Sequence, residues 1–212
     1  METRLFGLID RLIGEFDKAI KVLSVPAQPS REAPAGLPTA KLGEAEQRQS
    51  SRLMRVNHSG EVAAQALYRG QALTARSAAI GSAMRHAAAE EGDHLAWCEQ
   101  RLRELKGRTS VLNPLWYLGS FAIGAIAGRL DHGASLGFVA ETERQVESHL
   151  LDHLQRLSAA DGRSRAILEQ MKHDEVRHGA EARVLGGKEL PFLLRLAMRG
   201  TARLMTFGAY WL

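Results

Sequence analysis

Apolar residues recur at intervals of three and four along most of the chain, and this spacing predicts helices almost throughout. The first such stretch ends near residue 25, and its apolar positions form one face of an amphipathic helix. Four longer stretches follow at about 44–75, 78–105, 134–159 and 163–185. Lys-Gly, Asp-Gly and Gly-Gly pairs mark three of their ends. Gly60 interrupts the first of these four helices, which predicts close packing beside it.

Composition agrees with this pattern. Alanine, leucine, arginine and glutamate are frequent, whereas β-branched and aromatic residues are few. The pattern and the composition together predict an all-α protein whose main part is a four-helix bundle. The single cysteine excludes an intrachain disulfide and suits a reducing compartment.

The chain divides into three parts by composition. Residues 1–25 form the amphipathic helix, residues 26–43 have the Pro- and Ala-rich composition of a linker, and residues 44–212 hold the bundle domain. The first part mixes acidic and basic residues and has no uninterrupted apolar run, so it lacks the pattern of a secretory signal. The amphipathic helix is compatible with docking on the bundle, with binding a partner or with lying on a membrane.

The bundle domain contains one stretch of different character, residues 109–130, which carries no charged side chain between Thr109 and Gly128. Asn113 and Pro114 interrupt its start, and its most apolar part is too short to cross a bilayer comfortably. We therefore expect a partly buried or membrane-dipping crossover that connects the second bundle helix to the third.

The C-terminal stretch, residues 190–212, also has an unusual surface. Arg195, Arg199 and Arg203 are spaced by four, no acidic residue follows Leu190, and apolar residues cover most of the rest. A basic stripe beside a broad apolar face is typical of a helix that lies in a membrane interface, whereas packing on the bundle is the alternative. The net charge is only +4, and aromatic residues do not alternate with basic ones along the bundle, so we expect no nucleic-acid partner.

A pattern of polar residues occurs twice within the four bundle helices. Each time a lone glutamate is followed, after thirty or thirty-two residues, by Glu-x-x-His; the residues are Glu61, Glu91 and His94, then Glu143, Glu175 and His178. A glutamate and a histidine three apart lie on one face of a helix, and the longer separation allows the lone glutamate to lie level with them across a helical hairpin. Four carboxylates and two imidazoles are the ligand set of a two-metal site in a bundle and suit iron or manganese. Two divalent cations would also neutralise four glutamates, which are otherwise costly to bury.

Further carboxylates and histidines lie beside these six positions: Glu90, Asp174, Glu141, Glu147, His58 and His149. Glu90 and Asp174 each precede a histidine by four residues, so either could replace the adjacent glutamate by geometry alone. We assign these neighbours to solvent or to orienting the ligands. Cys98 follows His94 by one helical turn, but a soft thiolate adds little to a carboxylate site, so we expect a small buried side chain.

With these residues identified, the chain resembles the Coq7 family of ubiquinone biosynthesis, the 3-demethoxyubiquinol hydroxylases. The resemblance rests on RVNHSGEVAAQALYRGQ, EEGDHLAWCEQRL and ILEQMKHDEVRHGAEA and on the uncharged crossover, and it covers about residue 53 to the C-terminus. It implies a ferritin-like bundle with six iron ligands: Glu61, Glu91, His94, Glu143, Glu175 and His178. The first helix and the linker resemble the extended form found in some bacterial members.

The resemblance implies an O₂-dependent diiron monooxygenase, bound peripherally to the cytoplasmic side of the bacterial cell membrane. Its substrate would be 2-polyprenyl-3-methyl-6-methoxy-1,4-benzoquinol, its electrons would come from NADH or reduced quinone, and other ubiquinone-biosynthesis proteins are among its implied partners. A ferritin-like iron-binding or peroxide-scavenging protein is the main alternative, and the uncharged crossover and basic tail argue against it. A diiron hydroxylase of nucleic-acid bases and a metal-free membrane scaffold are further alternatives.

Overall fold

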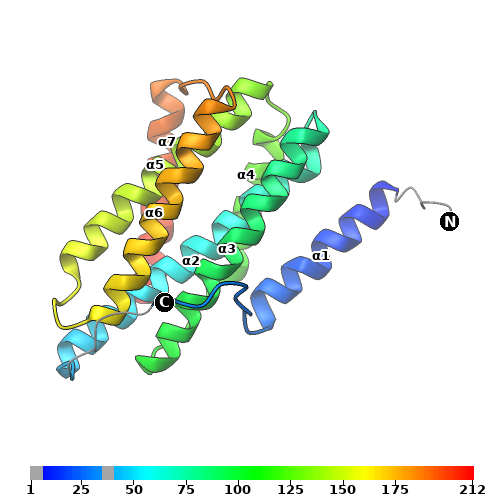
Figure 1. Ribbon diagram of the computed structural model, residues 1–212. Helices are drawn as coiled ribbons and strands as arrows, with labels where there is room; N and C mark the ends of the chain where they lie inside the picture. The colour runs from blue at the N-terminus through cyan, green and yellow to red at the C-terminus, as the bar shows by residue number, and fades with distance from the viewer. Residues whose placement is uncertain (1–6, 35–40) are drawn as a thin grey trace.

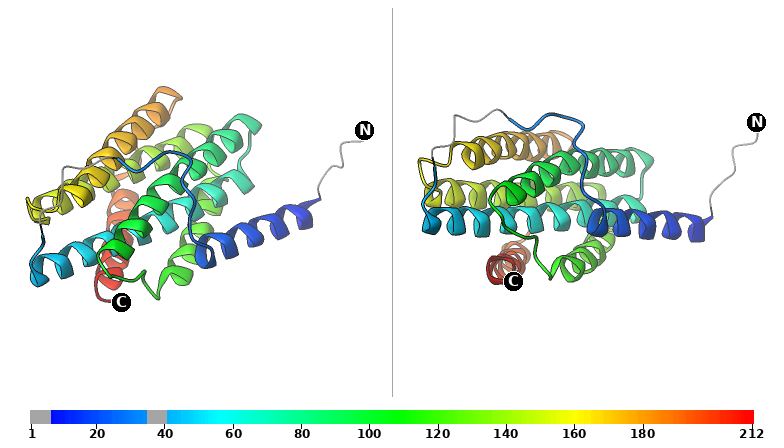
Figure 2. Two further views of the ribbon diagram at one scale, coloured as in Figure 1. Left: turned by 60° about the horizontal axis from the view of Figure 1, so that its bottom comes forward. Right: turned by 90° about the horizontal axis from the view of Figure 1, so that it is seen from below.

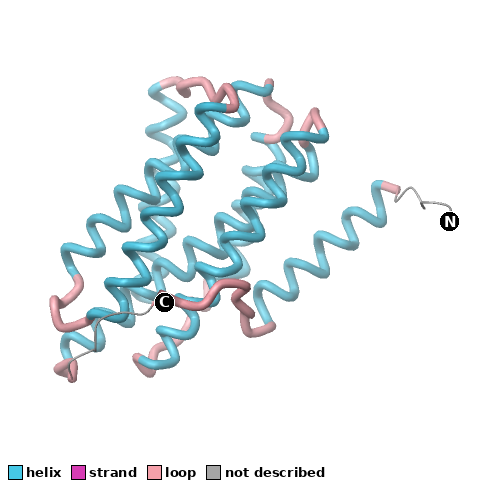
Figure 3. Tube along the Cα trace, viewed as in Figure 1, coloured by secondary structure: helices cyan, strands magenta, loops and turns pink. Residues whose placement is uncertain are grey.

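The computed structural model describes residues 7–34 and 41–212, and every regular element in these ranges is an α-helix (Figures 1 and 3). The helices are α1 (Leu8–Ser24), α2 (Glu44–Thr74), α3 (Ala78–Glu104), α4 (Asn113–Ala127), α5 (His132–Arg156), α6 (Gly162–Val184) and α7 (Phe192–Trp211). The prediction of an all-α fold is confirmed, and the four long bundle helices are displaced at their ends by at most three residues. The first six residues of the predicted N-terminal helix and positions 35–40 of the predicted linker lie outside the described residues. The division into domains stays a prediction.

The four long helices form two hairpins that pack into one bundle. α2 pairs with α3, and α5 pairs with α6. In the right-hand view of Figure 2, α3 and α6 form one layer, α2 and α5 form the next, and α4 and α7 lie beyond it on the same outer side. The predicted crossover, α4, thus covers one face of the bundle and connects the two hairpins.

The two largest apolar clusters of the bundle core lie at its opposite ends, with a polar section between them. One cluster includes Tyr68, Ile80, Met84 and Leu136. The other includes Leu53, Trp97, Leu102, Leu150 and Ile167. Burying each large apolar side chain contributes about 1.5–3 kcal/mol. On every bundle helix, the predicted metal ligands lie between the two clusters. Packing at both ends of the core therefore fixes the relative positions of the four helices at the level of these ligands.

The crossover α4 approaches α2 so closely that glycine is required on both helices. A Cβ on Gly124 would collide with the main-chain carbonyl of Leu67, and a Cβ on Gly70 would collide with that of Phe121. The prediction of close packing at Gly60 is wrong, because a Cβ placed there meets no atom within 4 Å. The helix contact that needs glycine lies ten residues further along α2.

Substitutions at these glycines are expected to have opposite effects on stability. Gly124→Ala should lower the free energy of unfolding by about 1–3 kcal/mol, because the added methyl forces α4 away from α2. Gly60→Ala should raise it by up to about 1 kcal/mol, because alanine favours a helix interior and the space is open. Urea denaturation followed by circular dichroism measures both changes. Equal effects from the two substitutions would contradict this account of the α2–α4 contact.

The N-terminal segment docks on the bundle. The last turns of α1 pack on the cluster around Val62 and Leu95, and Arg11 donates a hydrogen bond to the carbonyl of Leu73 at 2.9 Å. Ile13 and Phe16 stay 62% and 68% exposed, so part of the apolar face of α1 remains free. After α1 the chain crosses α3, where its main chain and side chains form several hydrogen bonds. The described part of the predicted linker is therefore attached to the bundle.

The C-terminal helix α7 is anchored at its end and exposed along most of its length. Arg55 donates to the main-chain carbonyl of Ala209 at 2.7 Å, and Ala209 is buried. Of the predicted arginine stripe, Arg195 pairs with Glu189 at 2.7 Å, while Arg199 and Arg203 are exposed. Within the described ranges, neither this helix nor any other is both long and apolar enough to cross a bilayer.

Candidate functional site

The six predicted ligands come from all four bundle helices and meet in the polar section of the core. α2 carries Glu61, α3 carries Glu91 and His94, α5 carries Glu143, and α6 carries Glu175 and His178. None of these side chains is more than 6% exposed. The helical periodicity that predicts a common face on each helix therefore brings all six into one cluster.

The cluster consists of two overlapping groups, and within each the potential ligand atoms lie within 4.8 Å of one another. The first group is Glu61, Glu91, His94 and Glu175, and the second is Glu91, Glu143, Glu175 and His178. Glu91 and Glu175 belong to both groups, whereas the two lone glutamates belong to one each. Two shared carboxylates between two histidine-containing groups are suited to bridge a pair of metal ions.

The two histidines are oriented by carboxylates from the opposite helix. His94 Nε2 lies 3.0 Å from an oxygen of Asp174, and His178 Nε2 lies 2.9 Å from an oxygen of Glu90. Because an ionised carboxylate only accepts hydrogen bonds, each Nε2 must carry the proton. Each Nδ1 then faces the glutamates of its group. Of the two roles predicted for Glu90 and Asp174, solvent exposure or orienting a ligand, these contacts favour the second.

The pKa values of the buried glutamates indicate how the cluster balances its charge when no cation is bound. Burial raises the pKa of Glu61 and of Glu143 well above their ordinary values, and the neighbouring glutamates add to the effect. Burial also acts to raise the pKa of Glu175, but the nearby imidazoles of His178 and His94 hold it below its ordinary value. In the absence of cations, the cluster must therefore take up protons to balance its charge. Two divalent cations would take the place of these protons.

Three buried polar atoms of the cluster lack hydrogen-bond partners and face one another, as the ligand atoms of a metal ion would. Glu91 Oε1, Glu175 Oε2 and His178 Nδ1 are buried and have no hydrogen-bond partner. The imidazole nitrogen lies 3.6 Å from the first oxygen and 3.5 Å from the second, so the three atoms face one another. Buried polar atoms without partners are costly, and one cation among them would satisfy all three. The mixture of carboxylate oxygen and imidazole nitrogen suits iron.

Comparison with known proteins identifies the family. The model of the family described as "Ubiquinone biosynthesis protein COQ7" matches residues 48–209. This chain belongs to the COQ7 family. The predicted family and the ferritin-like bundle are thereby confirmed.

Curated relatives match over nearly the whole chain. The chain is 55% identical over 215 residues to the 3-demethoxyubiquinol 3-hydroxylase of Ralstonia pickettii, covering 96% of this chain and 99% of the relative. It is 56% identical over 205 residues to the protein of that name from Cupriavidus necator, covering 95% and 99%. For the Bordetella pertussis relative the identity is 54% over 211 residues, with 99% of this chain covered. The prediction that the protein is a hydroxylase of ubiquinone biosynthesis is confirmed, and the similarity extends into the N-terminal segment.

Within this COQ7 site, Tyr68 is a residue that the sequence reasoning missed. Its hydroxyl donates to Glu143 Oε1, and its side chain is fully buried. Burial raises the pKa of the Tyr68 phenol well above its ordinary value, and the nearby glutamates add to the shift. Tyr68 follows Glu61 by seven residues, which is two helical turns, so the same periodicity could have placed it beside the cluster.

The remaining neighbours of the cluster lie apart from it. Glu141 accepts hydrogen bonds from Arg144 and Gln145, which leaves Glu143 as the carboxylate of α5 in the cluster. Burial lowers the pKa of His58 to about 4 and that of His149 to about 4, so both imidazoles are neutral at pH 7. Cys98, as expected, is a buried thiol, and its sulfur lies 3.8 Å from that of Met171. The ring of His149 lies 3.8 Å from that of His153, centroid to centroid, with the two planes tilted by 57°; the sequence did not single out His153.

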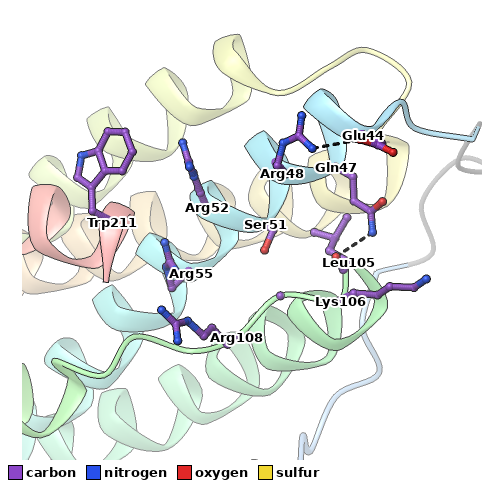
Figure 4. Close-up of a pocket in the computed structure, with 11 residues that line it drawn as sticks. Glu44, Gln47, Arg48, Ser51, Arg52, Arg55, Leu105, Lys106, Arg108 and Trp211 are labelled. Atoms are coloured by element: carbon purple, nitrogen blue, oxygen red, sulfur yellow. Dashed lines mark hydrogen bonds and ion pairs between the residues drawn. The ribbon is translucent and has the colours of Figure 1, made fainter.

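A basic pocket of about 560 Å³ lies where α2 begins and α3 and α7 end (Figure 4). Its lining includes Arg48, Arg52, Arg55, Lys106, Arg108, Glu44 and Trp211. The Arg52 guanidinium stacks over Trp211 at 4.7 Å. Burial lowers the pKa of Arg55, and the positive charges of Arg108 and Arg52 lower it further, so the pocket has an excess of positive charge. Such a pocket suits an anion.

Proposed function

We propose that the protein is a membrane-associated diiron monooxygenase that hydroxylates 2-polyprenyl-3-methyl-6-methoxy-1,4-benzoquinol in ubiquinone biosynthesis. The observation that carries the proposal is the pair of overlapping groups that share Glu91 and Glu175. The names of the relatives supply the substrate, because they are demethoxyubiquinol hydroxylases. The cluster supplies a binding site for the metal ions that such a reaction with O₂ requires.

The six clustered residues would hold two iron ions, and the bound irons would supply the electrons that reduce O₂ for ring hydroxylation. The protein's own residues prepare the site. Asp174 and Glu90 accept the Nε2 protons of the two histidines, so both Nδ1 atoms face inward. Tyr68 donates to Glu143 and restricts the orientation of that carboxylate. The apolar clusters at both ends exclude water from the section between them.

Membrane association is supported by the outer layer formed by α4 and α7, which lie on the same side of the bundle (Figure 2). Both helices expose large apolar side chains, including Leu115, Leu118 and Ile126 on α4 and Leu193, Leu204 and Phe207 on α7, each more than half exposed. Apolar surface of this extent is typical of contact with a partner or a membrane. A polyprenyl substrate resides in the bilayer, and the exposed Arg199 and Arg203 suit the anionic cytoplasmic leaflet.

Charged substitutions in this layer are expected to release the protein from membranes. Leu118→Asp combined with Phe207→Asp should lower binding to anionic liposomes by about tenfold or more, since each change removes about 1.5–3 kcal/mol of apolar burial. Val184→Asp is the matched control, because Val184 is 87% exposed but lies on α6, in the layer away from α4 and α7. Cosedimentation with vesicles measures the partitioning. Equal losses in both proteins, or none, would contradict a membrane role for this layer.

The basic pocket supports NADH as an electron source, because the two phosphates of NADH need positively charged partners. Trp211 offers an aromatic face beside Arg52 for a nucleotide base. Reduced quinone is the other proposed source, and supply of each reductant to the iron-loaded protein distinguishes them.

Quinone profiling tests the proposed function directly. A strain that lacks the protein should accumulate demethoxyubiquinone, and the purified protein loaded with iron should convert demethoxyubiquinol when O₂ and a reductant are present. Elemental analysis of anaerobically purified protein should give about two irons per chain. A ferritin-like store would instead take up iron far beyond this ratio and leave the quinone profile unchanged. Either result would overturn the proposal.

A further inference from the structure

Arg31, in the segment that precedes the bundle, is connected to the metal cluster through two side chains. Its Nη2 lies 3.1 Å from Asp174 Oδ2, the same oxygen that lies 3.0 Å from His94 Nε2. Its guanidinium also stacks over Trp97 at 5.0 Å, and the Trp97 ring lies 5.4 Å from the imidazole of His94. Arg31 therefore contacts both a hydrogen-bonding partner and a packing partner of one predicted ligand.

The same arginine also joins the two helices that carry the Glu-x-x-His pairs. Its Nε donates to Asp93 on α3 at 2.8 Å, and its other contact, Asp174, lies on α6. Asp93 immediately precedes His94 in the chain, and Asp174 immediately precedes Glu175. The two aspartates are 5% and 4% exposed at their side chains, so the bridge lies at the edge of the buried site. Since α3 and α6 belong to different hairpins, Arg31 links the hairpins at the level of the cluster.

The segment that carries Arg31 is held in place by its main chain. The amide of Ala27 donates to Glu99 at 2.9 Å, and the amide of Ser30 donates to Asp93 at 2.6 Å. Trp97 Nε1 donates to the carbonyl of Arg31 at 3.1 Å, and Arg163 Nη1 donates to that of Pro34 at 3.1 Å. The position of the guanidinium is thus set from both sides, which reduces the entropy cost of holding it on two carboxylates.

We propose that Arg31 is a positioning residue for the metal centre: it holds Asp174 and Trp97 against His94 and thereby secures the ion in the group that contains Glu61. This inference rests on the proposed metal centre. Removing Arg31 leaves Asp174 held against His94 only through its other oxygen, which accepts from Gln170. The carboxylate can then turn away, and the imidazole loses the hydrogen bond that directs its Nδ1 inward. The second group contains His178, which is oriented by Glu90 and not by Arg31, so its ion should be affected less.

The experiment compares iron release from the full-length protein and from Arg31→Ala, after loading with Fe²⁺ and transfer to a ferrous chelator. From Arg31→Ala, one of the two irons should be released about tenfold faster than from the wild type. The release rate of the other iron should stay within about twofold of the wild-type rate. Arg31→Lys should restore only part of the retention, because a lysine can still pair with Asp174 but cannot also bridge to Asp93 and stack on Trp97. Mössbauer spectra of the ⁵⁷Fe-loaded proteins should show that one iron environment changes and the other does not.

Two control variants distinguish a positioning role of Arg31 from its role in attaching the segment. Arg163→Ala and Glu99→Ala each remove a contact that holds the segment, but neither residue contacts the aspartates or Trp97. Both should release iron at the wild-type rate. Unchanged release from Arg31→Ala, or equally fast release from the two controls, would overturn the inference while leaving the metal centre intact. A wild-type protein that binds no iron would overturn the proposed function and this inference together.

Discussion

Glu175→Ala is expected to remove both irons and to lower quinol hydroxylation by more than about 100-fold. Glu175 belongs to both ligand groups and lies near both histidines, at 3.3 Å from His94 Nδ1 and 3.5 Å from His178 Nδ1. Removing a residue that only hydrogen-bonds to a metal ligand already lowers metal affinity by about 10–100-fold, so removing a ligand shared by both groups should lower it further. Iron analysis after desalting and a hydroxylation assay measure the two effects.

Glu169→Ala is the matched control for this experiment. Glu169 lies on the same helix, is exposed and pairs only with Lys172 among the described residues. It should leave iron content and activity unchanged. A Glu175→Ala protein that keeps one full equivalent of iron would show that the two groups do not share this carboxylate.

Glu143→Ala is expected to abolish hydroxylation, whereas Glu141→Ala is expected to leave it nearly unchanged. Glu143 is 2% exposed, belongs to the second ligand group and accepts the hydrogen bond of Tyr68. Glu141 is also buried, at 7% exposed, but its carboxylate is engaged by Arg144 and Gln145. The two glutamates are two residues apart and point to different sides of α5. Both substitutions remove the same chemical group, so a difference in activity reports only the side of the helix from which the group was removed.

The activity of Glu143→Ala should fall by more than about 100-fold, with loss of the second iron, because no other carboxylate of α5 is within reach. Glu141→Ala should lose some stability through its freed partners, Arg144 and Gln145, and denaturation measures that loss separately. The reverse result, an active Glu143→Ala and an inactive Glu141→Ala, would transfer the predicted ligand to Glu141.

Short-range periodicity explains why so much of the site could be predicted. Glu91 and His94, like Glu175 and His178, are placed on one helix face by their spacing alone, and helix geometry does not depend on the rest of the fold. The repeat of the pattern then indicates which four helices face one another. All six predicted residues lie in the cluster, and their role as metal ligands stays a prediction until iron is measured.

The errors and omissions have a common cause, because each depends on which helices pack together. Gly60 was expected at a close contact, but the direction in which α4 crosses α2 places that contact at Gly70. Linker composition predicted no role for Arg31, because nothing local indicates that residues 25–34 cross α3 beside Asp93. Tyr68 shares a helix face with Glu61, but its partner on α5 is 75 residues away.

The sequence by itself determined the all-α class, the ends of the four long helices, the six clustered residues and the family to which the chain belongs. These features depend on helical periodicity, on residues that end helices and on the residue sequences of the motifs, all of which are local. Only the tertiary structure decided that Glu91 and Glu175 are shared, that each histidine is oriented from the opposite helix, and that Arg31 reaches the site. These features depend on side chains that are distant in the chain and are brought together only when the hairpins pack around the buried charges.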